Sequence, residues 1–565
     1  RGHGRGKDQP FGVRGESNDG WQDNSNIRDR WSKEDYKFSA SGRGRGRERG
    51  QGREGGGRRN DTNDLADGFK RTGNDGREGE ERKTERYIPP EPTDDENVMF
   101  GNKITKGINF EKYDQIKIKV TGENIPRPVA SFEDCQFRKI LIDNIKKSGY
   151  IKPTPVQKHA LPIIRDGRDL MACAQTGSGK TAAFLIPILH NLLENSAPAN
   201  PGRPVAPQVI ICSPTRELAI QIFHEARKFA HGSTLKICIA YGGTVIFHQA
   251  QNVLKGCNIL VATPGRLNDF VEKGTVTFSS VQCFVLDEAD RMLDMGFLPA
   301  VEKMLLHESM TTSGERQTLM FSATFPEDIQ RLAGNYLLNY IFLAVGIIGG
   351  ACSDVEQVFY EVSKFDKRSK LVEILKEQST ADNKLTLVFV EQKRNTDFIA
   401  AFLCENGFPA TSIHGDRLQS QREEALHDFK TGRMPVLVAT AVAARGLDIK
   451  NVAHVINFDL PKSIDEYVHR IGRTGRLGNR GRATSFFDSS ADSQLAPQLL
   501  RILEQTGQEK PAFLVAAQGS ISIGASGFEF GDPGFGGEDV RGADSFLNSD
   551  RQYGGAHAIE EEEVW

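Results

Sequence analysis

A short glycine-rich string, AQTGSGKT at 174–181, has the residue types and the spacing of a phosphate-binding loop. The mostly apolar run 169–174 predicts a buried strand before it, and 181–186 predicts the start of a helix. Glycines let backbone N–H groups converge on phosphate oxygens, and the helix N-terminus adds a favourable dipole. Lys180 then reaches the β- and γ-phosphates, and the hydroxyl of Thr181 can ligate Mg²⁺. A plain glycine-rich turn before a helix is the alternative. The predicted nucleotide-binding positions are Ala174, Gln175, Thr176, Gly177, Ser178, Gly179, Lys180 and Thr181.

Two carboxylates follow another apolar run about a hundred residues later, in LDEAD at 286–290. The run 281–286 predicts a strand, which would place Asp287 at its tip to hold Mg²⁺ directly or through water. Glu288, one residue on, would orient and deprotonate the attacking water. Acidic residues after a strand are often only a solvated helix start. Together with the phosphate loop upstream, however, the pair predicts hydrolysis of a nucleoside triphosphate.

A third string, HRIGRTGR at 469–476, contains Arg470, Arg473 and Arg476 at a three-residue spacing. On a helix this spacing would put the three side chains near one face, and the fixed fork of arginine suits phosphate recognition. One interpretation is an arginine finger that a second domain supplies to the site built by the first. Hydrolysis would then depend on domain closure. A basic, solvated helix face is the other interpretation.

The elements that must position these residues are indicated by the hydrophobic pattern. At 565 residues the chain predicts two globular domains. Short apolar runs alternate with amphipathic segments, which predicts an α/β fold with parallel sheets covered on both faces. Strands are expected at 168–174, 207–213, 236–241, 258–262, 281–287, 317–321, 384–390, 410–414, 435–440 and 454–459. The expected domains are 130–345 and 356–512, joined by a linker at 346–355.

Composition predicts disordered ends. Residues 1–95 are rich in Gly and Arg, 96–129 form a flank, and 513–565 are rich in Gly and Phe and end in four glutamates before Trp565. Eight cysteines without a C-x-x-C pair indicate a reducing compartment and no zinc knuckle. No apolar run is long enough to span a bilayer, and the net charge of −3 identifies no partner. Because the chain begins at Arg1, we expect a fragment or a processed form.

In their order along the chain, these strings resemble those of the DEAD-box RNA helicases, named for the residues at 287–290. The resemblance covers about 130–510. It includes GYIKPTPVQ at 149–157, PTRELA at 214–219, TPGR at 263–266, SAT at 322–324, HGD at 414–416, QSQR at 419–422 and ATAVAARGLDI at 439–449. The flank at 97–135, the linker and the acidic end with Trp565 resemble the germline branch of the family more closely. The resemblance implies two tandem RecA-like domains with disordered tails.

The resemblance also assigns roles by position. Gln157 would hydrogen-bond the adenine edge, Phe132 would stack on the ring, and Asp448 would contact the ribose. Ser322, Thr324, His469 and Arg470 would couple the nucleotide site to domain closure. RNA-binding positions would be Pro214, Thr215, Arg216, Gly243, Thr263, Gly265 and Arg266 in the first domain, and His414, Gly415, Arg422 and Thr440 in the second. Contacts of this kind reach phosphates and 2′-OH groups and do not read sequence.

The function implied by the resemblance is ATP- and Mg²⁺-dependent unwinding or remodelling of RNA duplexes and ribonucleoproteins. Its expected setting is germline mRNA regulation, translation control and piRNA-linked granules of the perinuclear cytoplasm. Single-stranded RNA or short duplexes would be the partners, granule or translation proteins would bind the tails, and the core would be monomeric. An ATP-gated RNA clamp or granule scaffold with little strand separation needs the same residues and stays open.

Overall fold

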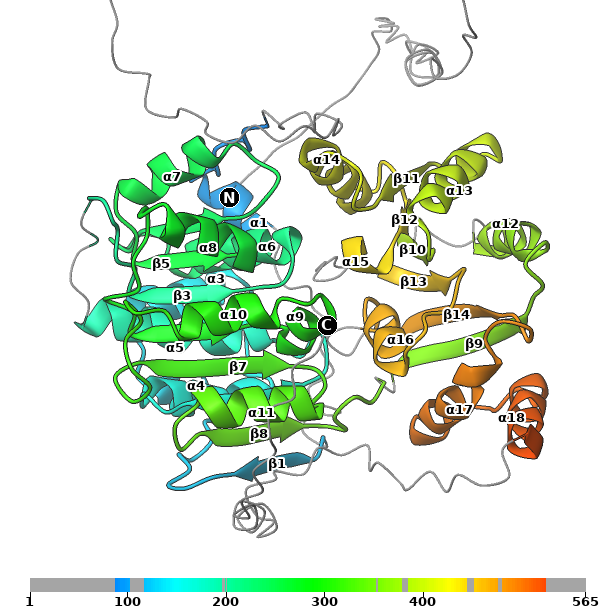
Figure 1. Ribbon diagram of the computed structural model, residues 1–565, viewed down its shortest axis with the longest axis horizontal. Coiled ribbons are helices and arrows are strands. Elements are labelled where there is room, and N and C mark those ends of the chain that lie inside the picture. Colours follow the sequence, from blue (N-terminus) through cyan, green and yellow to red (C-terminus); the bar gives the residue numbers. More distant parts are fainter. Residues whose placement is uncertain are drawn as a thin grey trace, which may run out of the picture. The chain divides into compact units, whose positions relative to one another are not determined.

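The structure is a computed structural model of the chain. It describes residues 87–101, 116–195, 199, 201–351, 354–378, 385–444, 452–475 and 480–524, the side chains of 520–524 excepted. Two β-sheets organise these residues (Figure 1). We call the range 116–345 domain 1 and the range 354–524 domain 2. This arrangement confirms the predicted pair of RecA-like parallel-sheet domains.

Domain 1 is built on an eight-stranded sheet with the order β1-β8-β2-β7-β6-β3-β5-β4. Only β1 runs antiparallel to its neighbour, and the other pairs are parallel. The strands are β1 (Ile118–Thr121), β2 (Leu170–Ala174), β3 (Val209–Cys212), β4 (Ile237–Ala240), β5 (Ile259–Ala262), β6 (Cys283–Leu286), β7 (Gln317–Ser322) and β8 (Ile341–Val345).

Helices cover both faces of this sheet, so the central strands are buried on both sides. On β2, Leu170 and Ala172 face one core while Met171 and Cys173 face the other. The first core includes residues of α3 (Lys139–Lys147), α4 (Pro155–Arg165), α5 (Lys180–Asn195) and α6 (Arg216–Phe229). The second includes residues of α7 (Ile246–Leu254), α8 (Pro264–Glu272), α9 (Ala289–Asp294), α10 (Leu298–Leu305) and α11 (Glu327–Tyr336).

Domain 2 is built on a six-stranded sheet with the order β11-β12-β10-β13-β14-β9, in which every neighbouring pair is parallel. Its strands are β9 (Val355–Glu361), β10 (Leu385–Phe389), β11 (Ala410–Ile413), β12 (Val436–Ala439), β13 (Val452–Asn457) and β14 (Gly481–Phe487). Its helices are α12 (Lys367–Gln378), α13 (Lys393–Glu405), α14 (Gln419–Lys430), α15 (Ala441–Ala444), α16 (Ile464–Ile471), α17 (Ala496–Gln505) and α18 (Ala512–Gly524). Short 3₁₀ turns lie at Glu133–Cys135 and Ser493–Leu495.

Three predicted boundaries need correction. Strand β1, inside the expected flank, pairs with β8 and so belongs to the sheet of domain 1. Helix α18 continues to Gly524, with Leu514 buried in a core shared with α17, so the C-terminal tail does not begin at 513. At the other end, residues 87–95 are ordered on domain 1 and lead into α1 (Glu96–Gly101). In these segments tertiary packing supplies the order that composition did not indicate.

The remaining parts of both predicted tails lie outside the described residues. Among the helices that the structure describes, none combines the length and the apolar character needed to cross a membrane.

Candidate active site

The phosphate loop lies between the end of β2 and the first residue of α5. Gly177 and Gly179 have φ angles of 77° and 90°, in the region that favours glycine. A Cβ atom on Gly179 would lie 2.6 Å from Nε2 of Gln157. The loop therefore needs glycine at 179 both for its backbone conformation and for the space beside Gln157.

The N-terminus of α4 holds this loop in place. Thr154 Oγ1 donates to the carbonyl of Ser178 at 2.8 Å, and Gln157 Nε2 donates to the carbonyl of Gly179 at 3.0 Å. The other amide atom of Gln157 accepts from the backbone N–H of Thr154 at 3.0 Å. The structure thus gives Gln157 a supporting role, and its contact with adenine stays a prediction.

Two other residues assigned to the nucleoside are less informative. Phe132 is 3% exposed and packs edge-on against Tyr150, so stacking on adenine also stays a prediction. Asp448 lies outside the described residues.

Lys180 is buried at the start of α5, where its Nζ donates to the carbonyls of Ala174 and Gln175 at 2.5 and 3.3 Å. Burial lowers the pKa of Lys180, while the charges of Asp287, Asp290 and Glu288 oppose that shift. Ser178 Oγ is buried without a hydrogen-bond partner in the described part of the chain. A free hydroxyl, a buried ammonium and a helix N-terminus together fit a triphosphate.

The two predicted carboxylates directly follow β6. Burial and the charge of Glu288 raise the pKa of Asp287 to about 7, although Lys180 opposes the shift. Glu288 has φ 52° and ψ 54°, an uncommon left-handed conformation for a non-glycine residue. Its Oε2 atom is buried and has no hydrogen-bond partner among the described residues. The Thr181 hydroxyl and the Asp287 carboxylate are hard oxygen donors of the kind that Mg²⁺ prefers, so these residues fit the ion.

Asp290, in the same string, is a coupling residue that the sequence analysis missed. Its Oδ2 accepts from the N–H groups of Ala323 and Thr324 at 3.2 and 3.0 Å, and from Thr324 Oγ1 at 3.0 Å. His469 Nε2 of domain 2 lies 3.3 Å from the same oxygen. Burial opposes ionisation of Asp290, but the hydrogen bond and charge of His469, with Arg291 and Lys180, outweigh it and lower the pKa of Asp290 well below its usual range.

This carboxylate joins two of the predicted coupling residues, Thr324 and His469, across the domain interface. A third of the four predicted coupling residues, Ser322, ends β7 with its hydroxyl buried and unpaired within the described part of the structure. Acidic residues give no local signal of such distant partners, which is why Asp290 was missed.

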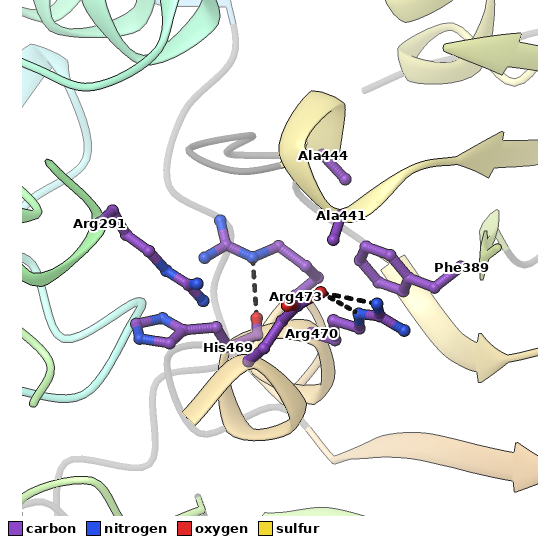
Figure 2. A pocket seen from close by; sticks show the side chains of 8 residues that line it. Arg291, Phe389, Ala441, Ala444, His469, Arg470 and Arg473 are labelled. Carbon is purple, nitrogen blue, oxygen red and sulfur yellow. Dashed lines mark hydrogen bonds and ion pairs between the residues drawn. The ribbon is translucent and has the colours of Figure 1, made fainter. Parts of the chain in front are cut away.

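The arginine string does not form one helical face. Helix α16 ends at Ile471, so Arg473 lies in the following turn, where its Nε donates to the carbonyl of His469 at 3.2 Å. Its Nη2 reaches to 3.9 Å from Oε1 of Glu288 in domain 1. Arg470 instead pairs with Glu466 at 2.6 Å and packs on the ring of Phe389 (Figure 2). Arg476 lies outside the described residues.

Arg470 is thus held within domain 2 by Glu466 and Phe389, and its part in interdomain coupling stays a prediction. The surrounding pocket takes residues from both domains: Arg291, Phe389, Ala441, Ala444, Glu466, His469, Arg470 and Arg473.

The phosphate loop also contacts the linker and domain 2 directly. Thr176 Oγ1 donates to the carbonyl of Gly472 at 3.1 Å, and Gln175 Nε2 donates to the carbonyl of Gly350 at 3.3 Å. A Cβ atom on Gly472 would lie only 2.3 Å from Thr176 Oγ1. Gln175 and Thr176 thus join the phosphate loop to the linker and to domain 2.

The predicted RNA-binding residues of domain 1 gather at the carboxyl ends of β3, β4 and β5. Pro214 and Thr215 follow β3, and the Thr215 hydroxyl caps α6. Thr263 and Gly265 follow β5 at the start of α8, and nothing would meet a Cβ atom on Gly265 within 4 Å. That open space suits the approach of a nucleic-acid backbone.

Two arginines of this group are fixed by side-chain contacts. Arg216 Nη1 donates to Gln419 Oε1 of domain 2 at 2.9 Å, and a Cβ atom on Gly243 would lie 2.2 Å from that same nitrogen. Arg266 Nη1 donates to Gln249 Oε1 at 2.8 Å. Gln249 also donates to Thr244 Oγ1, so it organises this surface.

The predicted RNA-binding residues of domain 2 follow its strands in the same way. His414 and Gly415 follow β11, and Thr440 follows β12. His414 Nε2 lies 2.9 Å from Asp397 Oδ2. Arg422 forms a buried ion pair with Glu217 of domain 1 at 2.7 Å. Glu217 and Gln419 were missed because a sequence string does not show which residue it meets across an interface.

Comparisons with known proteins agree with this geometry. Residues 154–332 match the DEAD/DEAH box helicase model, and residues 366–478 match the helicase conserved C-terminal domain. The chain is 57% identical over 486 residues to the ATP-dependent RNA helicase vasa of Drosophila melanogaster. This match covers 86% of this chain and 70% of the fly protein. It is 53% identical to the probable ATP-dependent RNA helicase DDX4 of Homo sapiens, over 82% of this chain and 64% of the human protein.

Two solved structures share the fold. Dbp5 of S. cerevisiae, bound to RNA and ADP BeF₃, is 28% identical with a TM-score of 0.58 and covers 68% of this chain and 95% of its own. Mss116p, bound to single-stranded RNA and AMP-PNP, is 28% identical with a TM-score of 0.59 and covers 72% of this chain and 84% of its own. The chain therefore belongs to the DEAD-box ATP-dependent RNA helicases, and within them to the Vasa/DDX4 type.

Proposed function

We propose that this chain is an RNA-dependent ATPase that separates short RNA duplexes and remodels ribonucleoproteins by opening and closing its two domains. The observation that carries the proposal is the 3.9 Å separation between Arg473 of domain 2 and Glu288 of domain 1. A carboxylate placed to activate water and an arginine placed to stabilise the transferred phosphoryl group meet only where the domains touch. Hydrolysis then requires the contacts between the domains.

Each catalytic side chain has a distinct task in this proposal. Glu288 orients the attacking water and accepts its proton, since its Oε2 is unpaired within the described residues and faces a buried site. Lys180 leaves the carbonyls of its own loop to hold phosphate oxygens. Thr181 and Asp287 hold Mg²⁺, which when bound neutralises charge on the phosphates. Asp290 accepts hydrogen bonds from the SAT loop and lies beside His469, so this pair holds the SAT loop of domain 1 next to α16 of domain 2.

RNA is the proposed second ligand, and it crosses both domains. The two neighbouring structures are described as bound to RNA or single-stranded RNA, which supports this assignment. Arg216 and Arg266 would hold phosphates on domain 1, while His414 and Thr440 extend the track on domain 2. Because ATP and RNA each favour contact between the domains, each ligand should tighten binding of the other.

The biological setting is proposed from the germline relatives. We infer action on mRNA translation and piRNA-linked granules of the perinuclear cytoplasm, with granule or translation proteins bound by the chain's ends. The monomeric core would provide the ATPase, and the ends would provide localisation.

Steady-state ATPase rates of the full chain with and without single-stranded RNA test the proposal. RNA should stimulate the rate strongly, and Lys180→Ala should abolish ATP binding because the phosphates lose their main counter-charge. Glu288→Gln should still bind ATP and RNA, but it should not hydrolyse ATP, whether RNA is present or absent. The variant should therefore accumulate as a long-lived RNA complex. Normal turnover by Glu288→Gln would show that the catalytic assignment is wrong.

A duplex-displacement assay run beside an RNA-retention assay separates the helicase from the clamp. Displacement that tracks ATP hydrolysis supports unwinding. Retention without displacement would leave the clamp as the better description.

A further inference from the structure

A strap formed by residues 87–101 lies along domain 1, outside the segments that match the helicase models. Arg227 of α6 donates to the carbonyl of Thr93 at 3.1 Å and pairs with Asp94 at 2.5 Å. Glu91 lies 3.5 Å from His248 of α7, and Glu96 pairs with Lys147 of α3. These contacts fix the strap to three helices of the same domain.

Each end of the strap has one further contact with domain 1. Phe100 is buried and packs edge-on against the ring of His231 at 5.8 Å. At the opposite end, the carbonyl of Tyr87 accepts from the backbone N–H of Val245 at 3.1 Å. Val245 lies two residues beyond Gly243, so Tyr87 is held beside the proposed RNA track.

Tyr87 alone among the described strap residues has a recorded hydrogen bond to domain 2. Its hydroxyl donates to Glu423 Oε2 on α14 at 2.6 Å. Every other strap contact named above is to domain 1. When the domains separate, the bond from Tyr87 to Glu423 must therefore break, while the rest of the strap can stay in place.

Glu423 also belongs to the interdomain network at the RNA side. Its Oε1 accepts from Tyr241 Oη at 3.3 Å and from Gln419 Nε2 at 3.1 Å. Gln419 in turn accepts from Arg216 of domain 1. The Tyr87 hydroxyl thus completes a set of contacts that holds Arg216 and the QSQR string together.

The sequence of the strap favours a preset conformation. Pro89, Pro90 and Pro92 follow Tyr87 closely, and each proline restricts its own φ to about −65°. Fewer conformations are then lost when the strap docks, so a single hydrogen bond at its end is less costly to form.

We propose that Tyr87 is a positioning residue for the RNA-dependent reaction, a latch that stabilises contact between the two domains through Glu423. The inference rests on the proposed function, because it assumes that domain closure governs RNA binding and hydrolysis. The latch should act on how easily RNA induces closure, and not on the chemistry once the domains have closed.

Tyr87→Phe in the full chain tests the latch, because it removes only the hydroxyl. We expect the RNA concentration that gives half-maximal ATPase to rise about 5- to 10-fold, as for loss of one ordinary hydrogen bond. The rate at saturating RNA should stay within about twofold of the parent. Tyr360→Phe on β9, where the ring packs against Lys370 of the same domain, is the matched control and should change neither value.

A double-mutant cycle with Glu423→Gln separates the latch from a merely structural tyrosine. Glu423→Gln should weaken RNA activation at least as much as Tyr87→Phe, and the double variant should be little worse than Glu423→Gln alone. Strictly additive effects, an unchanged RNA requirement, or tighter RNA activation in Tyr87→Phe would each overturn the proposal.

A readout without turnover keeps this test separate from the test of function. Two thiol-reactive dyes, one on exposed Cys404 of domain 2 and one at exposed position 306 of domain 1 after Leu306→Cys, report domain closure with RNA and a non-hydrolysable ATP analogue. Tyr87→Phe should reduce the closed population at limiting RNA. An unchanged population would refute the latch, whereas absence of RNA-stimulated ATPase in the parent chain would refute the proposed function instead.

Discussion

Domain 1 and domain 2 share a parallel-sheet architecture, yet they prepare their functional groups in different ways. In domain 1 the phosphate loop, Lys180, Asp287 and Glu288 are held by contacts within the domain, including the unusual backbone conformation of Glu288. In domain 2, Arg473 sits in a turn after α16, and its Nη2 lies 3.9 Å from Oε1 of Glu288 of the other domain.

The difference indicates how the two activities divide. A site whose main phosphate-binding groups are held within one domain can bind nucleotide before the domains close, and closure then tightens that binding. A group that works only across an interface makes the chemistry conditional on closure. Nucleotide binding should therefore depend mainly on domain 1, whereas the rate of hydrolysis should depend on both domains.

Removing Arg473 should give the largest effect on this division. Arg473→Ala should lower kcat by roughly 10³-fold, as for other arginine fingers, while the affinity for ATP changes only modestly. Steady-state kinetics with saturating RNA measure both values. Arg501→Ala, at an exposed position on α17, is the control. If the two variants behave alike, Arg473 does not act as an arginine finger and the comparison fails.

Asp290→Asn should have an intermediate effect, because it weakens the joint between the domains without removing a reacting group. The amide keeps the shape but loses the charge that the Thr324 and His469 donors face, and we expect roughly 10- to 100-fold slower RNA-stimulated turnover. Domain 1 should also lose about 2 kcal/mol of unfolding free energy, typical of a hydrogen bond to a charged group.

Thermal unfolding and RNA titrations measure the two effects of Asp290→Asn. Asp328→Asn, whose carboxylate pairs with Arg331 on the surface, is the control. Wild-type coupling in Asp290→Asn would mean that the SAT loop is held by other groups.

The smallest effect concerns domain 2 by itself. Burial, with a contribution from Arg482, lowers the pKa of His454 to about 3, and its Nε2 lies 2.7 Å from Thr484 Oγ1. The unfolded chain binds a proton at His454 below about pH 6.5, whereas the folded chain does not until about pH 3. Stability is therefore lost as the pH falls through this window, by up to about 1.4 kcal/mol per pH unit.

Urea-unfolding midpoints at pH 7 and pH 5, read by pulse proteolysis of domain 2 peptides, check this expectation. His454→Asn should be less sensitive to the change in pH than the parent chain. His427→Asn, at an exposed position on α14, should keep the parental sensitivity. An equal loss of stability in all three chains would assign the pH dependence to other groups.

The strand pattern could be predicted where the strands are central. β2, β3, β5 and β6 are buried on both faces, so their sequences are continuous apolar runs that stand out locally. β1 and β9 lie at the edges of their sheets, and their patterns mix exposed with buried residues, so no run marked them. β8 and β14 were also missed, although both are almost fully buried.

By itself the sequence determined the phosphate loop, the two carboxylates after β6 and the alternating architecture, because backbone conformation, helix start and strand burial are local properties. Only the tertiary structure decided which arginine reaches the site. Arg470 turns back to Glu466 and Phe389, while Arg473 passes the end of α16 toward Glu288. Likewise the partner of Tyr87 is Glu423, 336 residues away in the chain. Such pairs depend on how two separately folded sheets meet, and no spacing along a chain encodes that distance.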